Sequence, residues 1–280
     1  MNPVLDSPYR RRLISVGTRH GKQAQLGPAF HAVLHADLIT PPDLDTDQFG
    51  TFTGEKPRPN GALEAARAKA RLAIDATGLP YGLASEASYG SSPGAGWIGH
   101  EEILLFRDDI LDIEIIEGRR STSIPGTGHR VATSEELPHT MIAGLPEQAL
   151  IVRDTLGDVV KGITDTRTLR SVVAAAAARS TDGLVIVEPD LRAHHNPSRR
   201  LVLTRLAHSM ARRLATCCPD CGAPGFGRVR TEPGLRCRLC ESPTHLVRNV
   251  IHGCAACPYL LYHPVEAPWA DPAYCPECNP

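Results

Sequence analysis

The sequence predicts a mixed α/β domain, with a largely parallel sheet flanked by helices, followed by a small cysteine-rich domain that binds metal. Two observations support this prediction. From about residue 13 to residue 215, short apolar runs alternate with stretches of helical periodicity, as in an α/β sheet protein. All nine cysteines lie after residue 216, mostly in pairs separated by two residues. We therefore expect domains at 1–215 and 216–280.

The α/β domain is expected to contain seven strands and five helices. The strands are the apolar runs LISVG, ADLIT, YGLASE, EILLF, LDIEII, ALIVR and GLVIVE. Glu101 and Glu102 are expected at the solvated start of the fourth run. Helices fit best at 21–33, 61–77, 134–143, 165–179 and 197–215. The segments 41–60 and 86–100 are predicted to be long loops, and such loops at strand ends often carry sites.

Composition is typical of a soluble globular protein. The chain has 280 residues, 22% of them charged, and a formal net charge of -1. It contains no run of 18 apolar residues, and its start, MNPVLDSPYRRRLISVG, lacks the apolar centre of a signal peptide. We therefore expect a cytoplasmic protein, in which clustered cysteines bind metal rather than form disulfides.

The cysteines form four C-x-x-C pairs whose spacing is typical of zinc ribbons. Two thiolates three residues apart on a tight turn share one tetrahedral ion, and a second such turn completes its coordination. We expect two structural zinc ions and sequential pairing, in which the first two pairs bind one ion and the last two bind the other. An iron–sulfur cluster is the alternative, because spacing does not choose between metals that take four thiolates. The predicted ligands are Cys218, Cys221, Cys237, Cys240, Cys254, Cys257, Cys275 and Cys278, with Cys217 left over as an alternative to Cys218.

The cysteine-rich domain is expected to have a structural role, because its metal ions hold together a segment with a small core. Residues 216–280 contain five arginines, no lysines and six acidic residues, and each four-thiolate zinc site adds about two negative charges. This balance disfavours nucleic acid as a partner. We expect no membrane contact either, and the sequence does not indicate the oligomeric state.

Lys69 has an unusual position in the predicted helix 61–77. At about 100° per residue, the other charged residues of this helix form a solvated stripe, whereas Lys69 points toward the body of the protein among alanines. A lysine turned inward needs an anionic partner. That partner is either a carboxylate, Glu86 or Glu55, or the phosphate of a ligand.

The segment GLVIVEPDLRAHHNPSRR leads from a strand through a loop into the helix 197–215. Asn196 is placed to cap that helix and Pro197 stands at its first position, so terminal N–H groups are available to an anion. We expect this element to bind phosphate or carboxylate, and the alternative is a loop anchored to its own carboxylates, such as Asp190. The candidate binding residues are Arg192, His194, His195, Asn196 and Arg199, of which Arg199 points inward.

Three stretches of the first ninety residues resemble the inosine-triphosphatase-like nucleoside triphosphate pyrophosphatases. ISVGTRHGKQAQL matches a strand, turn and helix that carry a phosphate-binding Asn-x-x-Lys, with Lys22 on the lysine and Arg19 in place of the asparagine. EAARAKARLA is similar to the family helix whose lysine reaches the triphosphate, and Lys69 matches that lysine. TGLPYGLASEAS matches a strand that ends in a pair of magnesium-binding acids, where this chain has Ser85 and Glu86.

The resemblance implies a phosphate-binding site. Glu86 would hold a magnesium ion that aligns the attacking water, and the loop DTDQFGTFTGE supplies further magnesium candidates, although its composition also suits a plain connection. The residues expected to neutralise phosphates are Lys22, Lys69, Arg192 and Arg199, and the further magnesium candidates are Asp45, Asp47 and Glu55.

A closer resemblance covers nearly the whole chain. HGK, DTDQFGTFTGEKPRP, GLASEASYG, EPDLRAHHNPSRR and CPECNP together look like a bacterial family named domain of unknown function 6671. This resemblance implies the two-part layout and no substrate. The best functional hypothesis is a metal-dependent hydrolase of a phosphate-bearing small molecule. The alternative is a non-catalytic protein that senses a ligand or scaffolds a partner through its zinc ribbon.

Overall fold

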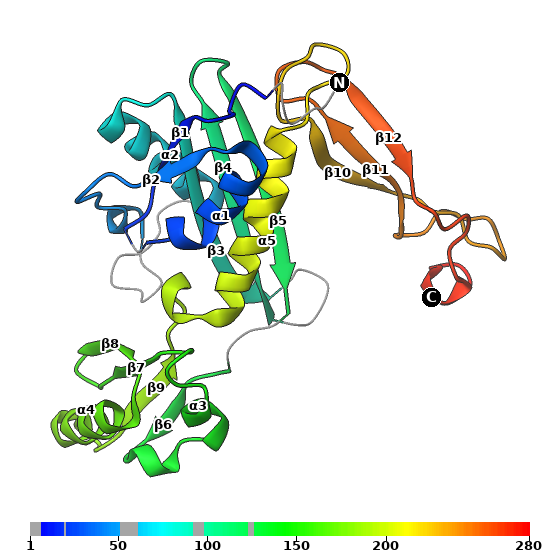
Figure 1. Ribbon diagram of the computed structural model, residues 1–280. Coiled ribbons are helices and arrows are strands. Elements are labelled where there is room, and N and C mark those ends of the chain that lie inside the picture. Colours follow the sequence, from blue (N-terminus) through cyan, green and yellow to red (C-terminus); the bar gives the residue numbers. More distant parts are fainter. Residues whose placement is uncertain (1–6, 20, 51–60, 92–97, 123–125) are drawn as a thin grey trace.

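The computed structural model describes residues 7–19, 21–50, 61–91, 98–122 and 126–280. These residues form three parts (Figure 1): a five-stranded sheet with helices on both faces, a separate four-stranded sheet, and a three-stranded sheet near the C-terminus. The prediction of a mixed α/β protein is confirmed. Among the described residues, no helix has the length and hydropathy needed to cross a bilayer.

The five-stranded sheet has the order β2-β1-β3-β4-β5. Strand β1 is parallel to both β2 and β3, whereas the pairs β3–β4 and β4–β5 are antiparallel. The sheet is therefore mixed rather than largely parallel. Its strands are β1 (Leu13–Val16), β2 (Asp37–Ile39), β3 (Tyr81–Ser91), β4 (Ile98–Asp108) and β5 (Ile113–Ser121).

Residues 86–91 and 98–100, which were expected in a long loop at 86–100, belong instead to the paired strands β3 and β4, and residues 92–97 lie outside the described residues. Eleven residue pairs join the two strands, from Tyr81 opposite Asp108 to Ser91 opposite Ile98. The short links from β3 to β4 and from β4 to β5 leave no room for a crossover helix, so the strands must be antiparallel. Residues 85–91 thus lie within the sheet, not beyond its end.

Helices cover both faces of this sheet. Helices α1 (Gln23–Leu34) and α5 (Pro197–Leu214) pack on one face and build the main core with residues such as Phe30, Leu104 and Met210. Helix α2 (Ala62–Thr77) packs on the other face through its alanines. These small side chains permit close approach of the backbones. Lys69 lies on the same face of α2 and is buried, as predicted.

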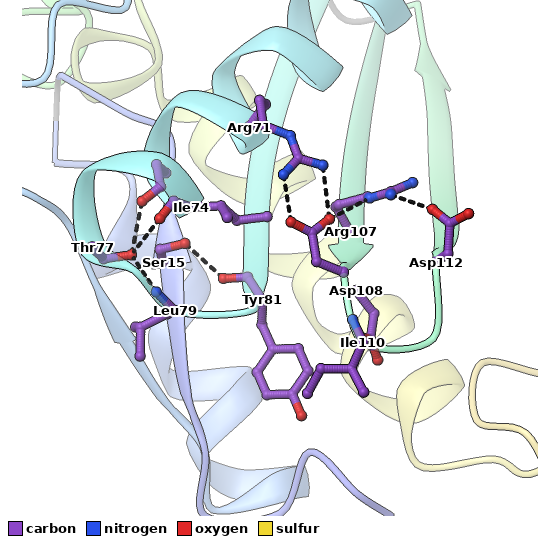
Figure 2. Close-up of polar contacts among 12 residues, drawn as sticks. Ser15, Arg71, Ile74, Thr77, Leu79, Tyr81, Arg107, Asp108, Ile110 and Asp112 are labelled. Carbon is purple, nitrogen blue, oxygen red and sulfur yellow. Dashed lines mark hydrogen bonds and ion pairs between the residues drawn. The ribbon is translucent and has the colours of Figure 1, made fainter.

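Polar contacts order the C-terminal half of α2 and the adjacent strands (Figure 2). Thr77 Oγ1 donates a hydrogen bond to the Ala73 carbonyl oxygen at 2.8 Å, and Ser15 Oγ donates to the Tyr81 carbonyl oxygen at 2.6 Å, joining β1 to β3. The Arg71 guanidinium binds both carboxylate oxygens of Asp109, just beyond β4. The position of α2 over β3 and β4 is therefore set by directional contacts as well as by packing.

The four-stranded sheet has the order β6-β9-β7-β8, is antiparallel throughout, and has its own core with helix α4. The helix expected at 134–143 is split, because Pro138 separates a short 3-10 turn from α3. The bounds are β6 (His129–Val131), α3 (His139–Ala143), β7 (Leu150–Arg153), β8 (Val159–Ile163), α4 (Thr166–Arg179) and β9 (Val185–Pro189).

The C-terminal sheet extends away from the rest of the molecule (Figure 1). It is antiparallel, with the order β10-β11-β12. Arg213 near the end of α5 ties it to the larger sheet, because its guanidinium donates to the carbonyl oxygens of Gly225 and Ile116, each at 3.0 Å. The strands are β10 (Gly227–Pro233), β11 (Val247–Gly253) and β12 (Leu260–Pro264).

The close approach of α2 to β1 gives a test of this packing. A Cβ added at Gly17 would lie 2.2 Å from the Lys69 carbonyl oxygen, so Gly17→Ala is expected to lower the free energy of unfolding by about 1–3 kcal/mol in a urea titration. Gly90→Ala is the control, because a Cβ there meets nothing within 4 Å, and its effect should stay within about 0.5 kcal/mol. Equal effects would contradict the packing described.

Candidate functional site

Two lysines from different helices meet at consecutive residues of β3. The Lys22 amine, at the start of α1, donates hydrogen bonds to the Ser85 carbonyl oxygen at 3.0 Å and to Ser85 Oγ at 2.9 Å. The Lys69 amine, from α2, donates to the Glu86 carboxylate, and both side chains are buried. Because successive strand residues point to opposite faces, the lysines approach β3 from its two sides. The ion pair predicted for Lys69 as one alternative is present.

A second buried ion pair joins α5 to β4. Arg199 and Glu102 are 1% and 0% exposed, and two guanidinium nitrogens of Arg199 each lie 2.9 Å from a Glu102 carboxylate oxygen. Arg199 also donates to the Leu191 carbonyl oxygen at 2.7 Å. Arg199 points inward as predicted. The prediction for Glu102 was wrong, because β4 begins at Ile98 and places Glu102 inside the sheet; Glu101, on the other side, is exposed.

Asn196 caps α5 as predicted and connects it to β3. Its side-chain oxygen accepts a hydrogen bond from the Arg199 backbone N–H at 3.1 Å, and its amide nitrogen lies 3.4 Å from the Tyr89 hydroxyl oxygen. The Tyr89 ring stacks on His100, with centroids 5.2 Å apart and an interplanar angle of 20°. Sequence reasoning missed Tyr89, His100 and Glu102, because they lie in a segment predicted as loop or solvated strand start.

These groups form one charged strip on the face of the sheet covered by α1 and α5. Both helices direct their N-terminal ends toward it, since their C-terminal carbonyls at Leu34 and Leu214 contact residues 7–11 at the other end of the sheet. Such helix ends favour an anion. We call this set the polar strip, and its members are Lys22, Ser85, Tyr89, His100, Glu102, Asn196 and Arg199.

Burial controls protonation in the polar strip. It lowers the pKa of Lys22 to about 8, although the nearby carboxylates of Glu86 and Glu102 act in the opposite direction. It also lowers the pKa of His100, against the effect of Glu102, so His100 is neutral at pH 7. Burial raises the pKa of Tyr89 to about 12. The strip thus combines two charged cations with a neutral imidazole.

The acids predicted to bind magnesium do not gather around Glu86. Asp47 and Asp45 lie 2.9 Å and 3.6 Å from the exposed Arg19 guanidinium, beside a hollow of about 500 Å³ at the ends of β1 and β2. Glu55 lies outside the described residues. Within the described ranges, only cysteines form groups of three or more His, Cys, Asp or Glu ligands close enough to share an ion. The described residues therefore do not fit the predicted resident magnesium ion.

Three further residues predicted to bind an anion, Arg192, His194 and His195, lie toward the four-stranded sheet instead of the polar strip. The Arg192 guanidinium binds the fully buried Asp190 carboxylate at 2.6–3.1 Å, which is the anchored-loop alternative. A Cβ added at Gly162 in β8 would lie 3.0 Å from His195 Nε2, so this ring packs on that strand. The His194 ring lies against His195, with centroids 4.0 Å apart. The predicted cluster is thus divided, and only Asn196 and Arg199 reach the strip.

The eight predicted cysteine ligands form two compact groups. Sγ–Sγ separations between the paired turns are 3.6 and 3.8 Å in one group and 3.5 and 3.9 Å in the other. Four thiolates at about 2.3 Å from a tetrahedral zinc ion would lie about 3.8 Å apart, so both groups fit such an ion. Cys217 belongs to neither group. The groups are Cys218, Cys221, Cys254 and Cys257, and Cys237, Cys240, Cys275 and Cys278.

The expectation of sequential pairing was wrong, because the pairs interleave. Gly227 at the start of β10 lies opposite Gly253 at the end of β11, so the first and third pairs meet at one end of the sheet. Asn249 near the start of β11 lies opposite Pro264 at the end of β12, so the second and fourth pairs meet at the other end. Antiparallel pairing therefore dictates the ligand sets, and each end of the sheet carries one site.

The fold and site define a mixed α/β protein with a charged strip on its five-stranded sheet, a separate four-stranded sheet, and a cysteine-rich module whose two four-cysteine groups are compatible with metal ions. The chain belongs to the family described as domain of unknown function (DUF6671), whose model matches residues 69–280. The match includes Lys69, Glu86, Glu102, Arg199 and all eight grouped cysteines, and it ends at the last residue. No curated protein matches the chain.

Interleaved pairing has a direct test in paired substitutions. Replacing Cys218 and Cys254 by serine disrupts one site, so the protein should retain one metal ion per chain in elemental analysis. Replacing Cys218 and Cys237 disrupts both sites and should leave none. Sequential pairing predicts the reverse pattern. Cys217→Ser is the control and should retain two ions.

Proposed function

We propose that the α/β body is a phosphoanhydride hydrolase of the nucleoside triphosphate pyrophosphatase type, acting on a phosphate-bearing small molecule. The convergence of Lys22 and Lys69 on Ser85 and Glu86 carries this proposal. These four residues come from three separate stretches that resemble inosine-triphosphatase-like enzymes, and the fold brings them together. We further propose that the metal ions of the cysteine-rich module are structural zinc.

The charges of the site suit a polyphosphate. Lys22, Lys69 and Arg199 carry three positive charges against the two carboxylates Glu86 and Glu102, and the other four groups all act electrostatically on Lys22. The N-terminal ends of α1 and α5 add positive potential. Preorganised cations of this kind stabilise the charge that develops when a phosphoanhydride bond breaks. The substrate is taken as its magnesium complex, in which the ion arrives with the phosphates.

The Lys69–Glu86 ion pair is the arrangement of the site without substrate. When a phosphate takes the hydrogen bond of the Lys69 ammonium, the Glu86 carboxylate is released and becomes available to orient the attacking water. Pairing in the absence of substrate also avoids the cost of leaving either buried charge alone. The two explanations of Lys69, ion pair and phosphate ligand, are therefore two states of one residue.

A second candidate function is ligand sensing without catalysis, with the cysteine-rich module as scaffold for a partner. One observation favours it: Ser85 stands where the resembling family has a second acid, and both buried carboxylates of the site already have cationic partners. A sensor of this kind would bind nucleotides without turnover. It shares the binding residues with the hydrolase, so only rate measurements separate the two.

Nucleotide hydrolysis is tested with a panel of standard, deaminated and oxidised nucleoside triphosphates. We expect wild-type protein with magnesium to release pyrophosphate or phosphate, and Glu86→Gln to lower kcat by about 100-fold or more, because the water loses its orienting carboxylate. Glu101→Gln is the control, since Glu101 is exposed on β4.

Loss of activity must be separated from loss of fold. Glu86→Gln leaves a buried lysine charge, so the double variant Lys69→Met with Glu86→Gln removes both charges and should keep the melting temperature near that of wild type. If this folded variant were as active as wild type, the hydrolase assignment would be wrong. Tight nucleotide binding by wild type with no turnover on any nucleotide would support the sensor instead.

Binding of a triphosphate should weaken as pH rises, because the pKa of Lys22 in the empty site is about 8 and the lysine then loses its charge. Glu86, Glu102, Arg199 and Lys69 surround it, and a bound phosphate would favour its charged form. We expect the Kd of a non-hydrolysable triphosphate analogue, measured by calorimetry, to rise about tenfold between pH 7 and pH 9. Lys22→Arg keeps its charge, so its Kd should stay flat over this range. Identical slopes for both proteins would exclude Lys22 as a phosphate ligand.

A further inference from the structure

His100 is the buried polar residue that the proposed hydrolysis does not use. Its side chain is 2% exposed, and neither ring nitrogen has a hydrogen-bond partner among the residues that the structure describes. Buried polar atoms without partners are rare in native proteins, and each one needs an explanation such as a ligand or an ordered water. For the His100 imidazole, a bound ligand would be such an explanation.

The surroundings of His100 fix which nitrogen can accept a hydrogen bond. His100 Nε2 lies 3.9 Å from Glu102 Oε2, and Arg199 holds that carboxylate with two hydrogen bonds. A carboxylate accepts only, so it favours the tautomer that carries the proton on Nε2. Nδ1 then presents a lone pair. The missing partner is consequently a hydrogen-bond donor, an O–H or N–H.

The position of His100 within the polar strip indicates which part of a ligand it meets. Tyr89, directly opposite His100 in the β3–β4 register, is four residues from Ser85 along β3, or about 13 Å. Lys22 occupies the Ser85 end of the strip, and Lys69 reaches the neighbouring Glu86 from the other face of β3. A ligand whose phosphates lie at the lysines therefore extends its other end toward the stacked rings of Tyr89 and His100.

We propose that His100 determines specificity by accepting a hydrogen bond, at Nδ1, from the non-phosphate end of a nucleoside polyphosphate. The donor is a sugar hydroxyl or a ring N–H of the base, and Glu102 and Arg199 are the positioning residues that set the tautomer. The inference rests on the proposed function, because it places the phosphates at Lys22 and Lys69. A site built to pair a ligand donor discriminates strongly against analogues that lack it, since the buried nitrogen is then left without a partner.

His100→Phe separates this role from a structural one. Phenylalanine keeps a flat ring against Tyr89 and removes two buried nitrogens that bond to no described residue, so the melting temperature should not fall. The control is His31→Phe, because His31 is exposed on α1. Calorimetry on the full zinc-loaded chain would compare inorganic triphosphate with non-hydrolysable ribonucleoside triphosphates, their 2′-deoxy forms, and bases with and without a ring N–H.

The expected result is that His100→Phe weakens ribonucleotide binding at least tenfold and leaves the Kd of inorganic triphosphate unchanged. If 2′-deoxynucleotides bind wild type as weakly as ribonucleotides bind the variant, the donor is the 2′-hydroxyl. If instead nucleotides whose base lacks a ring N–H bind wild type that weakly, the donor is the base. If His100→Phe weakens the binding of inorganic triphosphate and of nucleotides equally, or weakens neither, the role of His100 is overturned. In both cases the binding of nucleotides by wild type leaves the proposed function standing. Failure of wild type to bind any of these compounds overturns both.

Discussion

The buried ion pair between Arg199 and Glu102 connects the separate functional parts of this molecule. Both groups are removed from water, so loss of either partner would leave a buried charge at a cost of about 3–5 kcal/mol. The pair fixes the first turn of α5, which positions Asn196 beside Tyr89, and it holds the Glu102 carboxylate 3.9 Å from His100 Nε2. At its other end, α5 leads into the first cysteine pair, and Arg213 binds the module to the larger sheet. One helix therefore orders the polar strip and leads into the cysteine-rich module.

The arrangement of charges explains how an anion site can be stable when empty. Lys69 pairs with Glu86, Arg199 pairs with Glu102, and Lys22 bonds to Ser85, so each buried cation has oxygen partners. In the function that we propose, a polyphosphate would compete for the lysines and expose Glu86, so that binding and the release of this carboxylate would be a single event. Phosphate contacts would offset the cost of separating the pair, and a weakly charged ligand would not open the site.

Much of the layout could be predicted from the sequence, because its signals are local. Helical periodicity identified α2 and the inward direction of Lys69, and the Asn-Pro start of α5 identified its cap. Strand pairing depends on distant contacts, so a largely parallel sheet was expected, although the short links around β4 require antiparallel neighbours. Glu102 and His100 were missed because a glutamate pair before an apolar run is usually solvated. Cysteine spacing identified the eight cysteines that form the two groups, whereas their interleaved pairing follows from strand order, which spacing does not encode.

We propose that Lys22 and Lys69 hold the phosphates of one ligand from the two sides of β3. A crystal structure of the chain with bound zinc, magnesium and a non-hydrolysable nucleoside triphosphate would test this arrangement. We expect phosphate oxygens within hydrogen-bond distance of both lysine amines, with the Lys69–Glu86 contact broken. Phosphates bound away from both lysines, with that contact intact at saturating ligand, would contradict it.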